Sequence, residues 1–245
     1  MKKLIQIGLC LLICVISYTQ TTSSFVDTRD GQSYKIVKIG NQLWMAENLA
    51  YLPAVSPSYL PIKPLTFEFI AKPYYYVNGY SGGNVGEAKS TSNYATYGVL
   101  YNWPAAMNGA ASSINNPSGV QGVCPSGWHL PSDAEWTELI VFLGGKKVAG
   151  GKLKEIGNEH WHTPNEGGTN ESGFKALPGG CRKDYLMEGP NVKFQDIGWC
   201  GYWWSATEYG DEFAQRRLVY NNLANMIRYL PCAKEAGFSV RCVKD

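Results

Sequence analysis

The sequence predicts an α+β fold made of small antiparallel sheets, two short helices and long irregular loops. Hydrophobic residues make up 44% of the 245 residues and charged residues 17%, which is typical of a folded chain and excludes a disordered or fibrous one. Aromatic residues reach 13%, and 27 glycines indicate many turns. Because no internal repeat and no linker interrupts the chain, residues 20–245 are expected to form a single domain.

The first 19 residues have the pattern of a secretion signal. Lys2 and Lys3 precede an apolar run over residues 4–16, and the small residues Ser17 and Thr19 follow. The run is shorter than the roughly 20 residues that a membrane-spanning helix needs. We therefore expect residues 1–19 to be removed, no transmembrane helix in the mature chain, and a secreted or outer-surface location.

A lipid anchor on the cell surface is the alternative. Cys10 and Cys14 lie within the signal, but Leu9 and Ile13 precede them where lipoprotein processing requires a small residue. Loss of Lys2 and Lys3 with the signal lowers the net charge from +2 to 0. A neutral mature chain without a Lys/Arg cluster argues against a nucleic-acid partner.

Residues 25–49 have the pattern of a β-meander. Short runs of β-branched and aromatic residues alternate with two turn signals, Asp30-Gly31 and Gly40-Asn41, whose residues tolerate positive φ. Short antiparallel strands are expected on either side of each turn.

The next segments are predicted as loops. Residues 52–73 contain five prolines, each of which removes a backbone donor and fixes φ. Residues 79–94 are rich in Gly, Ser and Asn. A short helix is expected near residues 101–107, and residues 108–122 are again small and polar.

The clearest local signal is a capping box at Ser132 and Glu135. Apolar residues at the helical period follow it, and Gly144 ends the pattern. A weaker helix is expected over residues 151–156. Beyond it the sequence predicts a polar loop over 164–172 and turns or short strands over 160–163, 174–177, 198–207, 216–220, 226–229 and 239–243.

Five cysteines remain after the signal, and an exported chain meets an oxidising environment in which they tend to pair. They are Cys124, Cys181, Cys200, Cys232 and Cys242. No Cys-x-x-Cys spacing supports a zinc ribbon or a thioredoxin-type site. A bridge between Cys124 and Cys242 would fasten the chain's end to its middle, and Cys181 with Cys200 is the second predicted pair. The odd count leaves one thiol unpaired or intermolecular.

Short motifs rich in tryptophan, glycine and proline extend from about residue 25 to residue 245. They include Trp-Met-Ala-Glu-Asn-Leu at 44–49, Cys-Pro-Ser-Gly-Trp-His-Leu-Pro at 124–131, Asn-Glu-Ser-Gly-Phe at 170–174, Leu-Pro-Gly-Gly at 177–180, Trp-Trp-Ser-Ala-Thr-Glu at 203–208 and Phe-Ser-Val-Arg-Cys at 238–242. Together they resemble the Fibrobacter succinogenes major paralogous domain family. The resemblance implies an exported bacterial surface protein, often a lipoprotein, without an established activity.

The Gly-Trp-His-Leu-Pro-Ser pattern before a capped helix is also similar to the C-type-lectin-like fold, which formylglycine-generating enzymes share. That resemblance implies a crosslink between the start of the helical region and the last strand, of the kind that a Cys124–Cys242 disulfide would make. Two departures concern cysteines. Cys181 and Cys200 lie where the family is expected to have other residues, and the closely spaced cysteine pair of the formylglycine-generating enzymes is missing.

The loop over residues 164–171 is the candidate calcium site. Asn165, Glu166, Asn170 and Glu171 offer the hard oxygen donors that Ca²⁺ takes. The alternative is that these side chains bond their own backbone, as Asn and Glu in glycine-rich loops commonly do. No other metal and no cofactor is predicted.

The candidate ligand-binding residues are Trp203, Trp204 and Glu208, which together with Tyr202 could form an aromatic platform for a sugar ring. Alternation along a strand sends the two tryptophans to opposite faces. The alternative places both indoles in the core, because buried aromatics dominate small cores.

No coherent catalytic set emerges. The Gly-x-Ser-x-Gly pattern around Ser81 has no apolar helical period after it, and His160 and His162 have no converging partner in the sequence. The sequence thus favours a secreted or surface-displayed binding module for a glycan or another surface protein. A hydrolase or oxidase on the same scaffold and a purely structural surface protein are the alternatives.

Overall fold

The computed structural model describes residues 23–58, 71–183 and 194–245. The N-terminal strands are β1 (Ser23–Val26), β2 (Ser33–Ile39) and β3 (Gln42–Met45), and they pair antiparallel as the predicted meander. Gly31 and Gly40 adopt positive φ in the two turns, which is the conformation that the turn signals predict. The predicted signal over residues 1–19 lies outside the described residues.

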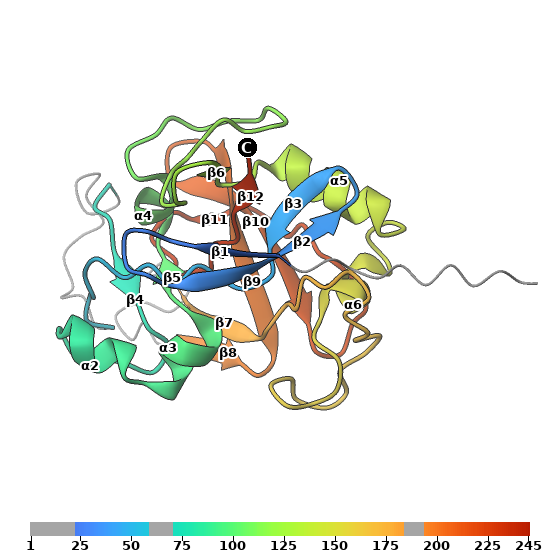
Figure 1. Cartoon of the computed structure of the whole chain (residues 1–245), viewed down its shortest axis with the longest axis horizontal. Coiled ribbons are helices and arrows are strands. Elements are labelled where there is room, and N and C mark those ends of the chain that lie inside the picture. The colour runs from blue at the N-terminus through green and yellow to red at the C-terminus, as the bar shows by residue number, and fades with distance from the viewer. Residues whose placement is uncertain (1–22, 59–70, 184–193) are drawn as a thin grey trace, which may run out of the picture.

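The last strand, β12 (Val243–Lys244), pairs with β3 on one side and with β6 (Trp128–His129) on the other. This completes a five-stranded sheet in the order β1-β2-β3-β12-β6. The C-terminal end of the chain therefore lies beside the N-terminal strands (Figure 1).

A second sheet is built around the long hairpin of β9 (Cys200–Tyr209) and β10 (Phe213–Tyr220). Its strand order is β11-β10-β9-β7-β8, with β7 parallel to β9 and the other pairs antiparallel. The flanking strands are β7 (Gly179–Arg182), β8 (Phe194–Ile197) and β11 (Cys232–Ala233). A separate ladder joins β4 (Tyr75–Tyr76) to β5 (Leu100–Tyr101).

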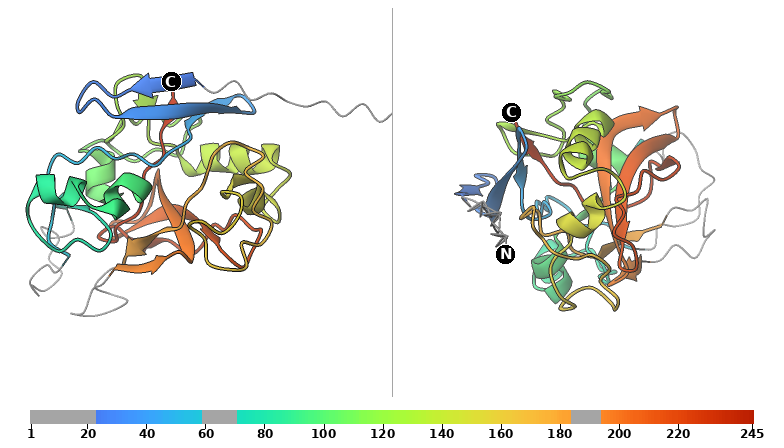
Figure 2. Two further views of the ribbon diagram at one scale, coloured as in Figure 1. Left: turned by 60° about the horizontal axis from the view of Figure 1, so that its bottom comes forward. Right: turned by 90° about the vertical axis from the view of Figure 1, so that its right-hand side faces the viewer.

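The described helices are all short: α2 (Val85–Lys89), α3 (Ser92–Tyr97), α4 (Trp103–Met107), α5 (Asp133–Phe142) and α6 (Ala149–Leu153). Figure 2 shows β1 to β3 on one side of the molecule and β9 with β10 on the other, with α2–α3 and α5–α6 at opposite ends. Within the described ranges, no helix has the length and apolar character that crossing a membrane requires.

The predicted capping box of α5 is confirmed. Ser132 Oγ accepts the amide of Glu135 at 3.2 Å, and Glu135 Oε2 accepts the amide of Ser132 at 2.9 Å. Trp136 and Leu139 of this helix are completely buried. The helix thus has the boundaries and the core-facing side that the sequence predicts.

The prediction of two helices is wrong, because the described residues contain five. Residues 79–94, predicted as a loop, include α2 and the first half of α3. Asn84 and Thr91 cap these helices by accepting backbone amides, but α3 buries none of its residues completely. A helix that buries no apolar face leaves no apolar period in the sequence. The weaker helix predicted at 151–156 is α6, which begins two residues earlier.

Two regions differ from the predicted strands. Residues 160–163 form no strand; Trp161 is buried there as a side chain, and its Nε1–H donates to the Ala176 carbonyl at 3.1 Å. The strands β5, β6, β7, β8 and β11 were not predicted. In β7, Gly180 leaves no room for a Cβ, which would lie 2.2 Å from the Gln195 carbonyl oxygen. Gly180 also has a φ of +65°, so this strand position favours glycine both for the close contact and for its backbone conformation.

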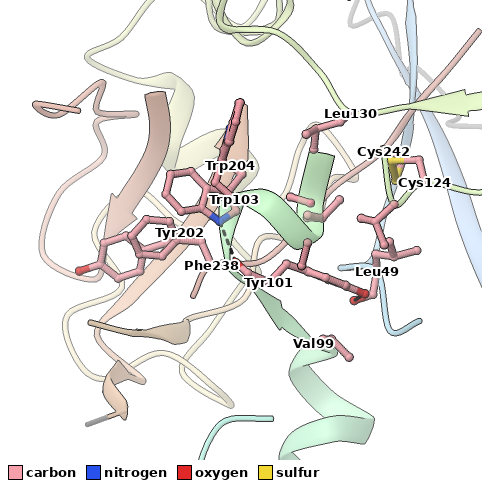
Figure 3. Packing of buried hydrophobic residues seen from close by; sticks show 14 of the residues in the cluster. Leu49, Val99, Tyr101, Trp103, Cys124, Leu130, Tyr202, Trp204, Phe238 and Cys242 are labelled. Atoms are coloured by element: carbon pink, nitrogen blue, oxygen red, sulfur yellow. Dashed lines mark hydrogen bonds between the residues drawn. A yellow bond between two sulfur atoms is a disulfide. The ribbon is translucent and has the colours of Figure 1, made fainter. Parts of the chain in front are cut away.

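The core has two parts on opposite faces of β9. Trp204 packs against Phe238 with 4.5 Å between ring centroids, in the cluster drawn in Figure 3. Trp203 faces the other way and lies against Trp136 and Phe174, at 6.3 and 6.0 Å. The strand therefore places consecutive indoles in different halves of the core, as period-two alternation requires.

The predicted bridge between Cys124 and Cys242 is confirmed (Figure 3). The second predicted pair, Cys181 with Cys200, is wrong: both are buried thiols, as is Cys232. Each sulfur contacts an oxygen atom instead of the other sulfur. Cys181 Sγ lies 3.8 Å from Asp196 Oδ2, and Cys200 Sγ lies 3.6 Å from the Gly201 carbonyl oxygen.

Candidate functional site

A polar cleft of about 460 Å³ opens between the N-terminal strands, the helices α2 and α3, and residues 160–177. Its volume lies within the range of small-molecule sites. The charged residues of its wall are Lys35, Glu47, Lys89 and Lys175, and His160 lies beside them. We call this site the polar cleft.

Asn48 and Arg241 form the floor of the polar cleft. Asn48 Oδ1 accepts from Arg241 Nη2 at 2.9 Å, from Arg241 Nε at 3.2 Å and from Trp203 Nε1 at 2.9 Å. The amide nitrogen of Asn48 donates to the Tyr97 carbonyl and to Ser239 Oγ. One asparagine thus joins the segment after β3, helix α3, strand β9 and the chain before β12.

Arg241 is a completely buried cation held by neutral groups. Its Nη1 donates to the carbonyls of Met45 at 3.1 Å and Phe174 at 2.6 Å, and its guanidinium carbon lies 4.1 Å from the centre of the Phe174 ring. No carboxylate in the described part of the chain pairs with it within 4.0 Å. Burial lowers the pKa of Arg241 to about 9, and the charge of Glu47 opposes this shift.

The wall of the polar cleft adds positive charge. Lys35 and Lys89 form no ion pair with any residue in the described ranges. Lys175 Nζ pairs with Glu155 at 3.3 Å, so its charge is largely balanced. Lys35, Lys89 and Arg241 therefore face a single lining carboxylate, Glu47, and the polar cleft has an excess of positive charge.

One group of side chains beside the cleft has the composition of a metal site. Glu155, Glu159 and His160 bring their ligand atoms within 4.8 Å of one another. Glu155 is already engaged, because it accepts His160 Nδ1 at 2.7 Å as well as the ammonium of Lys175. A cation bound here would compete with that ammonium, so the group fits a structural ion-pair cluster better than a metal centre.

The predicted calcium residues do not converge in that group. Asn165 donates its amide nitrogen to the carbonyls of Glu155 and Gly157, and Asn170 Oδ1 accepts the amide of Lys175. Glu171 pairs with Lys152 at 2.8 Å, and the backbone of Glu166 bonds to Asn221. Three of the four side chains are therefore engaged within the fold, and calcium binding by this loop stays a prediction.

The two predicted ligand-binding tryptophans lie in the core, in agreement with the alternative interpretation. Trp203 and Trp204 are 1% and 0% exposed, and the indole N–H of Trp204 donates to the Tyr101 carbonyl at 2.7 Å. Neither ring offers a stacking surface to a sugar in this conformation. Glu208 is exposed and pairs with Lys234 at 2.8 Å. Its role in binding stays a prediction.

The remaining candidates show no arrangement for covalent catalysis. Ser81 is exposed, and α2 begins only at Val85, so the segment does not form a strand-to-helix nucleophile turn. Burial raises the pKa of the Cys181 and Cys200 thiols, and the charge of Asp196 adds to the effect. These thiols are protonated at neutral pH, whereas a nucleophilic cysteine needs a lowered pKa.

The polar cleft was not predicted from the sequence, although two of its residues lie in motifs that stood out there. Asn48 belongs to the motif at 44–49 and Arg241 to the motif at 238–242. Their separation of 193 residues gives no local pattern from which a contact follows. The residue type is the signal that could have indicated this contact, because an arginine within a mostly apolar C-terminal run requires buried hydrogen-bond partners.

Comparison with known proteins agrees with the resemblance of the motifs. The model of the Fibrobacter succinogenes major domain matches residues 37–244. This range includes the core cluster around Trp203, the cluster around Trp204 except for Tyr34 and Ile36, and most of the polar cleft. No curated protein and no solved structure matches the chain.

Proposed function

The chain belongs to the Fibrobacter succinogenes major domain family, and from this we propose that it is an exported binding module whose polar cleft holds an acidic segment of a carbohydrate. The single observation that carries the proposal is the charge of the cleft. Three cations without a carboxylate partner, one of them buried, face one lining carboxylate. A bound uronate or sulfate group would supply the missing negative charge.

The proposal includes export and a C-type-lectin-like scaffold. The signal pattern of residues 1–19 supports export, and so does the Cys124–Cys242 bridge, since disulfides persist in oxidising compartments. The scaffold is supported by the long irregular segments and by the pairing of the last strand with an N-terminal one. In such a fold, loops from distant parts of the chain form the binding site.

The test is isothermal titration of the mature protein with tetragalacturonate and with its fully methyl-esterified form. The two probes share the sugar ring and differ in charge. We expect the acid to bind and the ester to bind about tenfold more weakly or not at all, because the ester cannot pair with the lysines. Added salt should weaken the binding of the acid, since exposed charges are screened.

Matched variants locate the interaction. Lys35→Gln combined with Lys89→Gln removes both unpaired wall cations and should weaken binding of the acid by about tenfold. Lys38→Gln is the control, because Lys38 is an exposed lysine of the same strand that does not line the cleft. Equal binding of acid and ester, or equal effects of the two sets of variants, would refute the proposal. Turnover of either probe would favour the hydrolase alternative instead.

A further inference from the structure

A second cavity, of about 220 Å³, shares no lining residue with the polar cleft. Aromatic and aliphatic side chains from β9, β10 and residues 229–233 form most of its wall. We call it the aromatic pocket and define it by Tyr202, Arg216, Tyr229, Pro231 and Phe238.

The inner wall of the aromatic pocket is rigid. The rings of Tyr202 and Phe238 are stacked, with 5.1 Å between centroids and 13° between planes, and Figure 3 shows them side by side. Both are buried, whereas Tyr229 is 52% exposed and Leu230 is 76% exposed at the outer edge. The pocket thus has a fixed aromatic wall and an apolar outer edge that a ligand would cover.

Two cations, Arg216 and Lys183, line this pocket, and Arg216 is the one that lies among its rings. Its guanidinium carbon lies 5.3 Å from the centre of the Phe238 ring and 5.7 and 5.9 Å from those of Tyr229 and Tyr202. Its Nε is buried and has no hydrogen-bond partner, and no described residue forms an ion pair with it. The Nε of the neighbouring Arg217 is also buried without a partner, but its Nη2 pairs with Asp133 at 2.8 Å, so the lack of an ion pair is what distinguishes Arg216.

The nearby carboxylate of Asp196 is not the anion that pairs with Arg216. Its Oδ2 accepts the hydroxyl of Tyr202 at 2.8 Å and lies 3.8 Å from the sulfur of Cys181. Its distance from Arg216 exceeds the 4.0 Å of an ion pair. Leaving a guanidinium among aromatic rings without an anion is costly, and a carboxylate with a fork of two oxygens satisfies it best.

We propose that the aromatic pocket binds a small aromatic monocarboxylic acid. The carboxylate pairs with Arg216, and the ring lies against Tyr229 and the stacked pair of Tyr202 and Phe238. The cavity volume suits a single ring with a short side chain rather than an oligosaccharide. This site is independent of the polar cleft, so failure of one proposal leaves the other standing.

Titration with 3-phenylpropionate and its neutral analogue 3-phenylpropionamide tests the proposal. The two probes have nearly the same shape and differ in charge. We expect the acid to bind and the amide to bind at least about tenfold more weakly. Hexanoate should also bind more weakly than 3-phenylpropionate, because it lacks the ring that contacts the aromatic wall.

Arg216→Gln should weaken binding of the acid at least about tenfold and leave binding of tetragalacturonate unchanged. Arg228→Gln is the matched control, because Arg228 is exposed, pairs with Asp133 and does not line the pocket. Tyr229→Ala provides a second variant that the fold tolerates, since half of this side chain is exposed. It should weaken the binding of 3-phenylpropionate but not that of hexanoate.

Three outcomes would overturn the assignment: no binding of 3-phenylpropionate at about 10 mM, equal binding of acid and amide, or wild-type binding by a folded Arg216→Gln protein. Thermal unfolding of each variant shows whether it is folded. The Arg216→Gln protein should stay folded, because it loses ring contacts of the guanidinium but also a buried nitrogen that has no hydrogen-bond partner.

Discussion

His129 is the residue at which helix α5 and the last strand meet. Its Nε2 lies 2.6 Å from Glu135 Oε1 and its Nδ1 lies 2.7 Å from Asp245 Oδ1, while the imidazole is 3% exposed. Burial alone would lower the pKa of His129, but the hydrogen bonds and charges of Glu135 and Asp245 outweigh it and raise this pKa. Glu135 also completes the capping box, so one carboxylate serves both the helix and the histidine.

A raised histidine pKa makes the folded state less stable as the pH rises. The protonated imidazole contributes its full stabilisation below the unfolded pKa of about 6.5, and this contribution is lost as the pH passes the raised pKa of the folded state. We expect the free energy of urea unfolding of the wild type to fall from pH 6 to pH 9 relative to His129→Gln. At pH 6 the variant should be less stable by about 3 kcal/mol, because the buried Glu135 loses its partner.

His162→Gln is the control for this experiment, since His162 is exposed and its ring is tilted against that of Trp199, with 4.5 Å between centroids. It should keep the pH profile of the wild type. A His129→Gln profile that runs parallel to the wild type would show that the histidine does not titrate between the two carboxylates.

At the scale of the elements, glycine permits contacts that a side chain would prevent. A Cβ on Gly150 would lie 2.2 Å from the Asn225 carbonyl oxygen, and one on Gly151 would lie 2.4 Å from the Gly167 carbonyl oxygen. Helix α6 therefore packs backbone against backbone on two sides. Helix propensity alone favours alanine at both positions, so the packing determines the residue.

Gly150→Ala should lower the free energy of unfolding by about 3 kcal/mol, because the backbone of residue 225 must move to admit the methyl group. Gly86→Ala is the matched control in α2, where the nearest atom is the side-chain oxygen of Asn84 at 3.3 Å. Its effect should stay below about 1 kcal/mol. Urea unfolding measures both, and a Gly150→Ala protein as stable as Gly86→Ala would contradict the backbone contact.

Elements with local sequence signals were predicted, and elements that depend on tertiary contacts were not. The sequence predicts helix α5 because its cap and its buried face, including Trp136 and Leu139, both lie within one short segment. Helix α3 was missed because it is capped by Thr91 but buries no complete side chain. Strand β7 was missed because Gly180 reads as a turn residue, whereas its contact with residue 195 makes it a packed strand position.

At the scale of the whole molecule, both candidate sites depend on contacts between distant segments. Asn48 and Arg241 are 193 residues apart, yet two hydrogen bonds join them in the floor of the polar cleft, and a third joins Asn48 to Trp203 in the core. The aromatic pocket likewise needs Tyr202 from β9 and Phe238 from the segment between β11 and β12. Motifs indicated that these residues matter to the fold, but only the tertiary structure shows which cations lack an anion.

The Cys124–Cys242 bridge is a covalent link between residues that are 118 positions apart in the sequence. It helps to hold these distant segments together. Cys124 lies in the turn before β6, and Cys242 precedes β12, which pairs with β6. The bridge therefore fixes the two chain segments whose neighbours form the sheet beside the polar cleft.

Replacing both residues, Cys124→Ala with Cys242→Ala, should lower the free energy of unfolding by about 4 to 5 kcal/mol, because a long loop regains its freedom in the unfolded chain. Cys181→Ala with Cys200→Ala is the control: it removes two buried sulfurs but no crosslink, and should cost about 2 to 3 kcal/mol for the lost packing. The urea dependence separates the two, since only loss of the crosslink exposes more surface in the unfolded state and steepens the slope. A peptide map without reductant should recover residues 124 and 242 in one linked fragment, and recovering them as separate thiol peptides would contradict both the bridge and the predicted loss of stability.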